Sequence, residues 1–364
     1  MAGVCADGEP SPGEFCFDFH DTPEVIAPIL VSGARFATEL PPAIAVFSAG
    51  NTATLVRWDN DQTEVTPLIP KISPASYVRA LPVDVQDSEE PELVISHLWG
   101  ASLSPNLAGE LQALVPVGFP EEAFGLPGLS VPVDLDGDKK PEYIKGAGKK
   151  LELWRKPLDT WVKDPSFGFE VPGCKFLADF ALGDFNDDGF ADLAYIGAAD
   201  ADGDADCASA SAQGIAILLR TEPGGFVAAP AISTGAHAYR NVKAGDFDAD
   251  GRDDIASLGS NDELLLFRST GDGEFASPLI LGGVLSFVVG NLDGDSASEC
   301  LLNRKGQGVV IIDRIFAATT EMPAPNLLGH PLAAIDLNHD GVDDIAFLWE
   351  GLEAPSLGIA ISTP

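Results

Sequence analysis

Short apolar runs, each stopped after a few residues by glycine, proline, asparagine or aspartate, follow one another along the chain. The clearest set of four runs covers residues 242–247, 254–258, 263–268 and 275–281. Runs of this length between turn residues are typical of β-strands, because a buried helix needs about ten or more residues. The pattern therefore predicts one antiparallel unit of four strands, A to D.

An acidic segment joins strands A and B of this unit, and similar segments recur along the chain. Their first residues lie at 84, 134, 184, 246, 291 and 336, at intervals of 50, 50, 62, 45 and 45 residues. A period of this size, with four short strands in each unit, predicts propeller blades rather than a helical solenoid. An earlier unit within 44–69 has strands B, C and D without an acidic segment, so we expect seven units.

The two ends of the chain predict how a ring would close. The last unit ends after strand C, near residues 357–362, and segment 24–30 resembles strand D of the unit at 242–281. We expect this N-terminal strand to complete the last blade, because a closed ring leaves few free sheet edges. The fold class predicted is all-β: a seven-bladed β-propeller of four-stranded antiparallel blades, forming a single domain over 1–364. The expected blades are 31–72, 76–125, 128–173, 175–234, 237–282, 284–325, and 330–364 together with 14–30.

The acidic segments have the chemistry of a cation site. Asp246, Asp248 and Asp250 alternate, Gly251 follows, and Asp254 comes four residues after Asp250. Four carboxylates converging on one point would repel each other strongly unless a cation lay between them. Ca²⁺ prefers oxygen ligands, and the glycine permits the sharp turn around it. We therefore expect about four or five Ca²⁺ ions, each in a loop between strands A and B.

The expected ligands follow the same spacing in five segments. They are Asp134, Asp136, Asp138 and Glu142; Asp184, Asn186, Asp188 and Asp192; Asp246, Asp248, Asp250 and Asp254; Asn291, Asp293, Asp295 and Glu299; and Asp336, Asn338, Asp340 and Asp344. The segment that begins at Asp84 lacks two carboxylates and the glycine, so an acidic turn without an ion is the better interpretation there.

Two alternatives to these sites were weighed. An EF-hand loop ends in a glutamate at its twelfth position and lies between helices, whereas the twelfth residues here are Lys145, Tyr195, Ser257 and Phe347. Acidic turns without an ion are the other alternative. The insertion at 200–206 has four alternating aspartates, and either another cation site or a flexible acidic loop accounts for it.

The charge of the chain restricts its partners and its location. The 56 acidic and 21 basic residues give a formal net charge of −35, which disfavours nucleic acid and anionic membranes. No apolar run approaches the 18 residues of a membrane-spanning helix. Calcium loops of moderate affinity are filled outside cells, where Ca²⁺ is about millimolar. We expect a monomeric bacterial protein that is secreted, periplasmic or at the cell surface.

Segments such as 183–194 resemble the FG-GAP or VCBS-type repeat of integrin α-subunit propellers, bacterial secreted proteins and fungal propeller lectins. The resemblance covers nearly the whole chain, and it implies a seven-bladed propeller with Ca²⁺ in the A–B loops. It also implies that the metal loops lie on one face and the B–C and D–A connections on the other. On that second face we expect Cys174 and Cys207 to form a disulfide, with two unrelated thiols as the alternative. Cys300 lies in an apolar stretch and is expected to be a buried free thiol.

Several residues expected on the face opposite the metal loops suit a sugar or a peptide side chain. They are His97, Trp99, His237, Tyr239, Arg240, His330 and Trp349. The alternative for aromatic residues at strand ends is packing between blades, which we also expect of Trp58 and Trp154. The predicted function is a calcium-stabilised, exported binding module for a glycan or a surface protein.

Catalytic motifs offer little support for an enzyme. The chain has no nucleophile elbow, zinc-protease motif, phosphate loop or dinucleotide fingerprint. A polysaccharide lyase or hydrolase on a propeller scaffold remains an alternative, because 56 acidic residues make many carboxylate pairs conceivable. A structural scaffold module is the third alternative.

Overall fold

The structure is a computed structural model of the 364-residue chain. It describes residues 17–26, 28–34, 43–48, 52–59, 62–68, 77–83, 92–97, 100–104, 106–107, 110–111, 115–116, 129–133, 142–147, 150–156, 160–170, 177–197, 214–221, 225–232, 239–259, 261–316, 320–323, 329–350 and 355–362. All regular elements among these residues are β-strands. None of the described segments is a helix with the length and apolarity needed to cross a bilayer.

The described strands form seven four-stranded antiparallel sheets, numbered here as blades 1 to 7. Blade 1 contains β2 (Pro28–Ala34), β3 (Ala43–Ser48), β4 (Thr52–Asp59) and β5 (Gln62–Leu68). Blade 2 contains β6 (Tyr77–Val83), β7 (Glu92–His97), β8 (Gly100–Ser104) and β11 (Val115–Pro116). Blade 3 contains β12 (Ser130–Val133), β13 (Glu142–Ala147), β14 (Lys150–Arg155) and β15 (Val162–Lys163).

Blades 4 to 7 continue the same order, with the strand nearest the centre of the ring first. Blade 4 contains β16 (Leu177–Gly183), β17 (Asp192–Gly197), β18 (Ala216–Thr221) and β19 (Gly225–Ala228). Blade 5 contains β20 (Arg240–Gly245), β21 (Asp254–Leu258), β22 (Glu263–Phe267) and β25 (Leu279–Gly282). Blade 6 contains β26 (Val284–Gly290), β27 (Glu299–Arg304), β28 (Gly308–Asp313) and β29 (Thr320–Pro323). Blade 7 contains β30 (Gly329–Ile335), β31 (Asp344–Glu350), β32 (Pro355–Ser362) and β1 (Phe17–Ile26).

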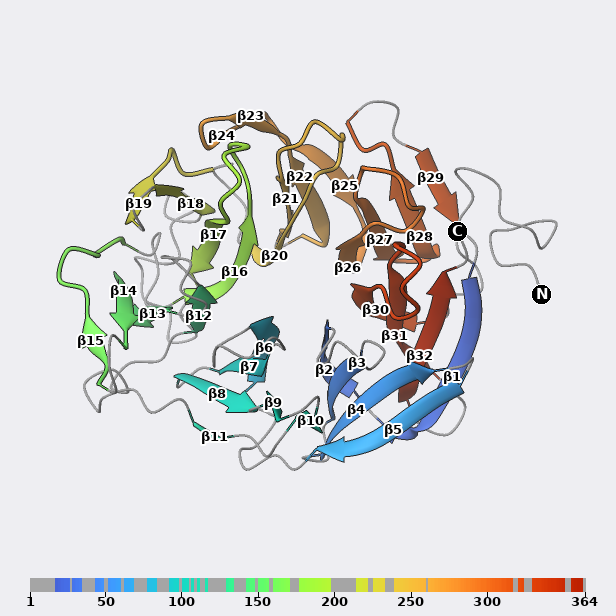
Figure 1. Ribbon diagram of the computed structural model, residues 1–364. Coiled ribbons are helices and arrows are strands. Elements are labelled where there is room, and N and C mark those ends of the chain that lie inside the picture. Colours follow the sequence, from blue (N-terminus) through green and yellow to red (C-terminus); the bar gives the residue numbers. More distant parts are fainter. Residues whose placement is uncertain are drawn as a thin grey trace.

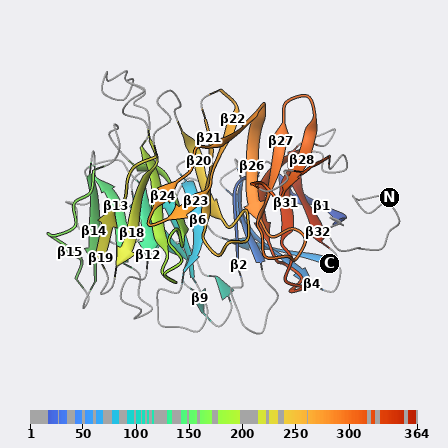
Figure 2. The same cartoon turned by 90° about the horizontal axis from the view of Figure 1, so that it is seen from above.

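The sheets stand side by side around a common centre, as Figure 1 shows, and the view turned by 90° in Figure 2 shows them edge-on, in one layer. Two small hairpins, β9 (Asn106–Leu107) with β10 (Glu110–Leu111) and β23 (Ser269–Gly271) with β24 (Glu274–Phe275), lie outside the seven sheets. The predicted all-β propeller class is confirmed.

The strand that joins the two ends of the chain differs from the one predicted. Residues 17–22 of β1 pair with β32, from Phe17 opposite Ser362 to Thr22 opposite Leu357. Residues 28–30, which were expected in this closing strand, instead begin β2, the inner strand of blade 1. The physical reason is visible in the sequence, because Phe17 and Phe19 alternate with polar residues as a half-buried strand requires.

Strand D of blade 5 also begins later than predicted. Segment 275–281 was expected to form it, but Phe275 pairs with Ser269 in the small hairpin, and β25 begins at Leu279. Pro278 lies directly before β25 and has no N–H to donate to a ladder, which limits the strand to the residues after it.

The core lies between the blades rather than within any one of them. Ile255 and Leu265 of blade 5 pack against Ile196 and Ile217 of blade 4, and all four are at most 2% exposed. Corresponding clusters join blades 3 and 4, 5 and 6, 6 and 7, and 7 and 1. Since each sheet is covered on both faces, the middle of its second strand is mostly apolar, which explains the continuous apolar runs in the sequence. Trp58 and Trp154 are buried, so their predicted role in packing is confirmed.

Glycine at the end of the inner strand allows neighbouring blades to approach closely. A Cβ on Gly183, Gly245 or Gly290 would lie 2.5–2.8 Å from a side-chain carbon of the next blade. The nearest carbons belong to Ala244, Val289 and Ala334, respectively. Any larger residue at these three positions would therefore force adjacent blades apart.

Candidate metal centres in the acidic loops

Four acidic loops are described in full, and each joins the first and second strands of its blade. Loop 4 (184–192) follows β16, loop 5 (246–254) follows β20, loop 6 (291–299) follows β26 and loop 7 (336–344) follows β30. Strands therefore flank all four loops, which excludes the helix-loop-helix arrangement of an EF-hand. Of the predicted ligands in the corresponding segment of blade 3, Asp134, Asp136 and Asp138 lie outside the described residues.

The first aspartate of a loop organises the backbone around it. The two carboxylate oxygens of Asp246 accept hydrogen bonds from the N–H groups of Asp250 at 3.1 Å and Gly251 at 2.9 Å. Asp184 accepts equivalent bonds from Asp188 and Gly189. Gly251 has a φ of +89°, a conformation that glycine adopts without strain. These bonds curl the loop so that its alternating side chains converge.

The ninth residue of each described loop is buried, and in blades 4, 5 and 7 its carboxylate links the loop to the end of the third strand or to the residues directly after it. In blade 5, Asp254 accepts hydrogen bonds from Phe247 N at 3.0 Å and from Ser269 N at 2.7 Å. Asp192 and Asp344 make the same pair of bonds in blades 4 and 7. Burial raises the pKa of Asp192 to about 6 and the pKa values of Asp254 and Asp344 to about 7. The ninth acid is thus a structural anchor as well as a candidate ligand.

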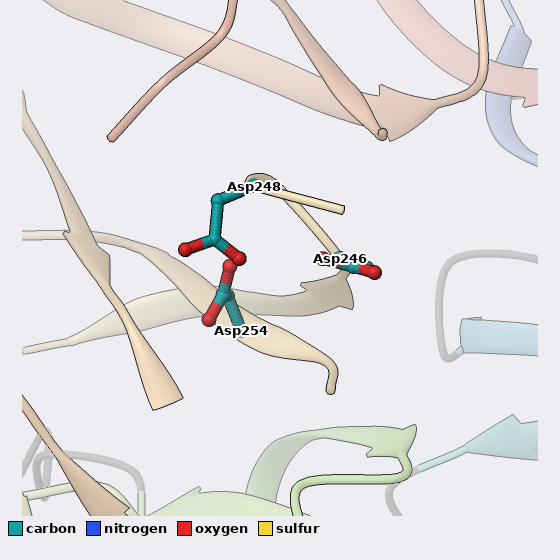
Figure 3. Close-up of side chains that lie close together, drawn as sticks. All are labelled: Asp246, Asp248 and Asp254. Carbon is teal, nitrogen blue, oxygen red and sulfur yellow. The ribbon is translucent and has the colours of Figure 1, made fainter. Parts of the chain in front are cut away.

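Loop 5 brings three carboxylates together. Oxygen atoms of Asp246, Asp248 and Asp254 lie within 4.8 Å of one another, and Figure 3 shows the Asp248 carboxylate turned towards Asp254. The Asp248 side chain is 10% exposed, and its Oδ1 has no hydrogen-bond partner among the described residues. A buried acceptor of this kind calls for a positive ligand, so the loop fits a divalent cation.

Two arginines already balance part of the charge in loop 5. The Arg268 Nε contacts Asp248, and its Nη2 lies 3.4 Å from Asp250. Arg252 also contacts Asp250 through its guanidinium and donates its backbone N–H to the same carboxylate. Asp250, a predicted ligand, is therefore engaged by arginine in this structure.

Loop 6 forms a second cluster, from Asp293, Asp295 and Glu299, with oxygen atoms again within 4.8 Å of one another. Glu299 is fully buried, and its Oε2 accepts a hydrogen bond from Leu292 N at 2.7 Å. Its Oε1 has no partner among the described residues. Burial, followed by repulsion from the two aspartates, raises the pKa of Glu299 to about 9. This loop also fits a divalent cation.

Loops 4 and 7 have an asparagine at the third position, between two acids. Asn186 donates to Asp188 at 3.0 Å, and Asn338 donates to Asp340 at 2.7 Å. The amide thus replaces one carboxylate of the cluster and reduces the negative charge that a cation would have to balance. The amide oxygen of each asparagine is also a suitable ligand for Ca²⁺.

Hydrogen bonds between neighbouring loops were not predicted. Asp253 accepts a hydrogen bond from Asp184 N at 2.8 Å and donates its own N–H to Asp184 O at 2.8 Å. Asp343 of blade 7 makes the same two bonds to Asn291 of blade 6. The sequence feature that could have predicted these bonds is the pair of adjacent aspartates that ends loops 5 and 7. The second aspartate of each pair is a predicted metal ligand, and no role was predicted for the first. The eighth residue of one loop therefore holds the first residue of the previous loop.

Four of the residues expected to bind a partner are described with their side chains, and they lie at the end of the blades opposite the acidic loops: Tyr239, Arg240, His330 and Trp349. Tyr239 is 8% exposed and packs against Phe267, and Trp349 is half-buried beside Phe347. Arg240 is exposed and its Nη2 lies 3.3 Å from Asp262, while His330 Nδ1 lies 2.9 Å from Asn303 Nδ2. The packing seen for the two aromatic residues corresponds to the alternative considered for them.

Other predicted positions lie outside the described residues or have no described side chain. Trp99, His237, Cys174 and Cys207 are outside, so the disulfide stays a prediction, and of His97 only the backbone is described. Cys300 is a buried free thiol, as predicted.

Comparison with known proteins supports the repeat and the fold. Residues 199–257, which include loop 5, match the FG-GAP-like repeat family. A comparison with curated protein sequences gives no match.

Two solved structures are similar along most of the chain. One is a lectin from Agrocybe aegerita that recognises non-reducing terminal N-acetylglucosamine, with 15% identity, coverage of 83% of this chain and 81% of the lectin, and a TM-score of 0.54. The other is BBS1N in complex with ARL6DN, with 13% identity, coverage of 95% and 97%, and a TM-score of 0.57. At these identities the similarity concerns the fold alone.

Proposed function

Because this chain is an FG-GAP-repeat β-propeller, we propose that it is a calcium-stabilised, exported binding module. The loops on one face bind Ca²⁺, and the opposite face binds a glycan or an extracellular protein. The observation that carries the calcium part is a buried carboxylate oxygen in each of two acidic clusters, Asp248 Oδ1 and Glu299 Oε1, for which the described residues supply no hydrogen-bond partner. A divalent cation would supply the missing partner for both oxygens.

Calcium removal tests the first part of this proposal. A ligand that binds only the folded state stabilises it by about 2.7 kcal/mol when its concentration is 100 times the Kd. We therefore expect the melting temperature to fall clearly in EDTA and to recover when Ca²⁺ is restored. Isothermal titration should give about four or five bound ions per chain. A protein that melts at the same temperature with and without EDTA, and takes up no Ca²⁺, would refute this part.

The opposite face is the proposed binding surface because the positions of Arg240 and His330 lie there, away from the loops. Arg240 is exposed on this face, and Arg314 is an exposed arginine next to loop 6 on the other face. Glycans are the first class to test, since one of the similar folds belongs to a lectin. The other similar fold, BBS1N, was solved in complex with a protein, so an extracellular surface protein is the second class of ligand to test.

A glycan array, probed with and without EDTA, tests this surface. We expect binding to be lost in Arg240→Ala and retained in Arg314→Ala, which removes the same charge from the loop face. An equal loss of glycan binding in both variants would argue against the opposite face as the binding surface. No binding to any glycan on the array would direct the search to extracellular proteins.

A further inference from the structure

One position in the third strand of each blade lies directly opposite the ninth loop residue. The position follows from extending the strand register by one residue beyond the last paired residues, which are Cys300 with Ile312 in blade 6 and Ile255 with Phe267 in blade 5. In blades 3 to 7 the opposite residues are, in order, Arg155, Leu219, Arg268, Asp313 and Ile361. Blade 6 is thus the one described blade of these five in which an acid faces an acid.

The arginines at this position balance acidic groups. Arg155 Nη1 lies 3.3 Å from Glu142 in blade 3, and Arg268 contacts Asp248 and Asp250 in blade 5. In blades 4 and 7 the residue is aliphatic and adds no charge. Blade 6 reverses the pattern, because Asp313 adds a fourth carboxylate beside the three of loop 6.

The side chain of Asp313 is buried, unlike an ordinary surface acid, and one of its oxygens is available to a ligand. The residue is 9% exposed, and its Oδ1 has no hydrogen-bond partner among the described residues. Its Oδ2 lies 3.5 Å from the Nε of Arg314, whose own side chain is 66% exposed. Glu299 Oε1, on the neighbouring strand, is also buried and has no hydrogen-bond partner in the described part of the chain. Two buried carboxylate oxygens on paired strands therefore receive no hydrogen bond from any described residue.

The electrostatics of the neighbouring acids support this placement. Burial is the main cause of the raised pKa of Glu299, and the charge of Asp313 raises it further. The same holds for Asp293. Asp313 therefore acts on both of these loop carboxylates.

We propose that Asp313 binds the cation of loop 6 together with Asp293, Asp295 and Glu299, and that this site binds divalent cations more tightly than the other loops. The inference rests on the proposed calcium function, and it adds a ligand that lies outside the repeated motif. More carboxylates at a site raise its affinity for Ca²⁺, since ligand charge is a main determinant of the dissociation constant. Loops 5 and 6 each have three clustered carboxylates. Loop 5 has Arg268 beside its cluster, whereas loop 6 has Asp313 at the corresponding position, with the exposed Arg314 next to it.

The test compares the tightest Ca²⁺ site, measured by isothermal titration, in the wild-type chain, Asp313→Asn and Asp262→Asn. Asp262 is an exposed acid at the opposite end of blade 5 and serves as the matched control. We expect Asp313→Asn to weaken the tightest site by about tenfold or more and Asp262→Asn to leave it unchanged. An unchanged tightest site in Asp313→Asn, with normal binding by the wild type, would overturn this inference alone. No Ca²⁺ binding by the wild type would overturn the proposed function and this inference with it.

Thermal unfolding separates a ligand from a structural residue. If Asp313 is a ligand, the asparagine variant should melt higher than wild type in EDTA, because a repelling charge is gone, and should gain less from Ca²⁺. A variant that melts lower than wild type in EDTA and gains as much from Ca²⁺ would show that Asp313 is structural. Asp313→Leu introduces the residue found at this position in blade 4, Leu219. Like Asp313→Asn, it should raise the melting temperature in EDTA and reduce the gain from Ca²⁺.

Discussion

Loops 5 and 6 share a backbone design but differ in how their charge is balanced. In both, the ninth acid accepts a hydrogen bond from the second residue, and the fifth acid accepts one from the seventh. Loop 5 has Arg252 and Arg268 as internal counter-ions, while loop 6 has Asp313 in the place of Arg268. The comparison shows that one loop geometry occurs with arginine counter-ions in blade 5 and with an additional acid in their place in blade 6, where the proposed cation would balance the charge. Dependence on calcium should therefore differ from blade to blade.

The largest expected effect comes from removing the ninth acid of loop 5. In Asp254→Ala the buried N–H groups of Phe247 and Ser269 lose their acceptors, which should destabilise the protein by about 2–5 kcal/mol. Urea unfolding in EDTA measures this without a contribution from Ca²⁺. Glu274→Ala, an exposed acid of the same blade, should change stability by less than about 0.5 kcal/mol. Equal effects of the two substitutions would contradict the anchoring role of Asp254.

The junction between blades 6 and 7 should be the next most sensitive. In Gly290→Ala the new Cβ would lie 2.5 Å from that of Ala334, so we expect a loss of about 1–3 kcal/mol from overpacking. Gly282→Ala is the matched control, since nothing lies within 4 Å of its Cβ position at the end of β25. Chemical denaturation of both variants checks the difference, and a tolerated alanine at 290 would mean that the blades can separate slightly without loss.

The raised pKa values predict how the calcium-free protein responds to pH. Asp254, with a pKa of about 7, and Glu299, with a pKa of about 9, bind protons more tightly when folded than when unfolded. Their contribution is fully present below the ordinary carboxyl pKa of about 4 and is lost as the pH rises through 7 and 9. In EDTA we expect stability to fall by about 1–2 kcal/mol for each group over this window.

A titration of melting temperature against pH in EDTA measures this loss. Glu299→Gln should flatten the curve between pH 7 and 9 and make it less steep between about pH 4 and 7, where Asp254 still contributes. Saturating Ca²⁺ should suppress the loss, because the cation replaces the proton. Parallel curves for the two proteins would show that Glu299 does not titrate in this range.

The smallest expected effect tests the arginine of loop 5. Arg268→Leu copies the residue of blade 4 and removes the counter-ion from Asp248. Stability in EDTA should fall by about 0.5–1 kcal/mol, since the arginine is half-exposed and its ion pairs are partly screened. The affinity of the loop 5 site for Ca²⁺ should rise by a few-fold, measured by titration calorimetry. Lower affinity in this variant would mean that Arg268 organises the site rather than competing with the cation.

Much of the fold could be predicted from local patterns. The apolar runs predicted β3, β4 and β5 of blade 1 although this unit has no acidic segment. The alternating acids predicted the clusters of loops 5 and 6. The closing strand begins earlier than the prediction from the similarity of 24–30 to another segment, because the alternation of Phe17 and Phe19 with polar residues extends the strand towards the N-terminus. That alternation is the ordinary signal of a half-buried strand.

The spacing of residues within a repeat is enough to predict a cluster of acids, because a turn of nine residues brings alternating positions together. The first, third and ninth residues meet in loop 5, and the third, fifth and ninth meet in loop 6. The sequence by itself therefore determined the repeating four-stranded unit, the acidic loops and the oxygen-rich chemistry of their sites. Only the tertiary structure decided that Asp253 accepts a hydrogen bond from Asp184, that Ala334 packs closely against Gly290 and that Asp313 lies opposite Glu299. These pairs are 14 to 69 residues apart, and their contacts depend on strand register and on the stacking of one sheet against the next.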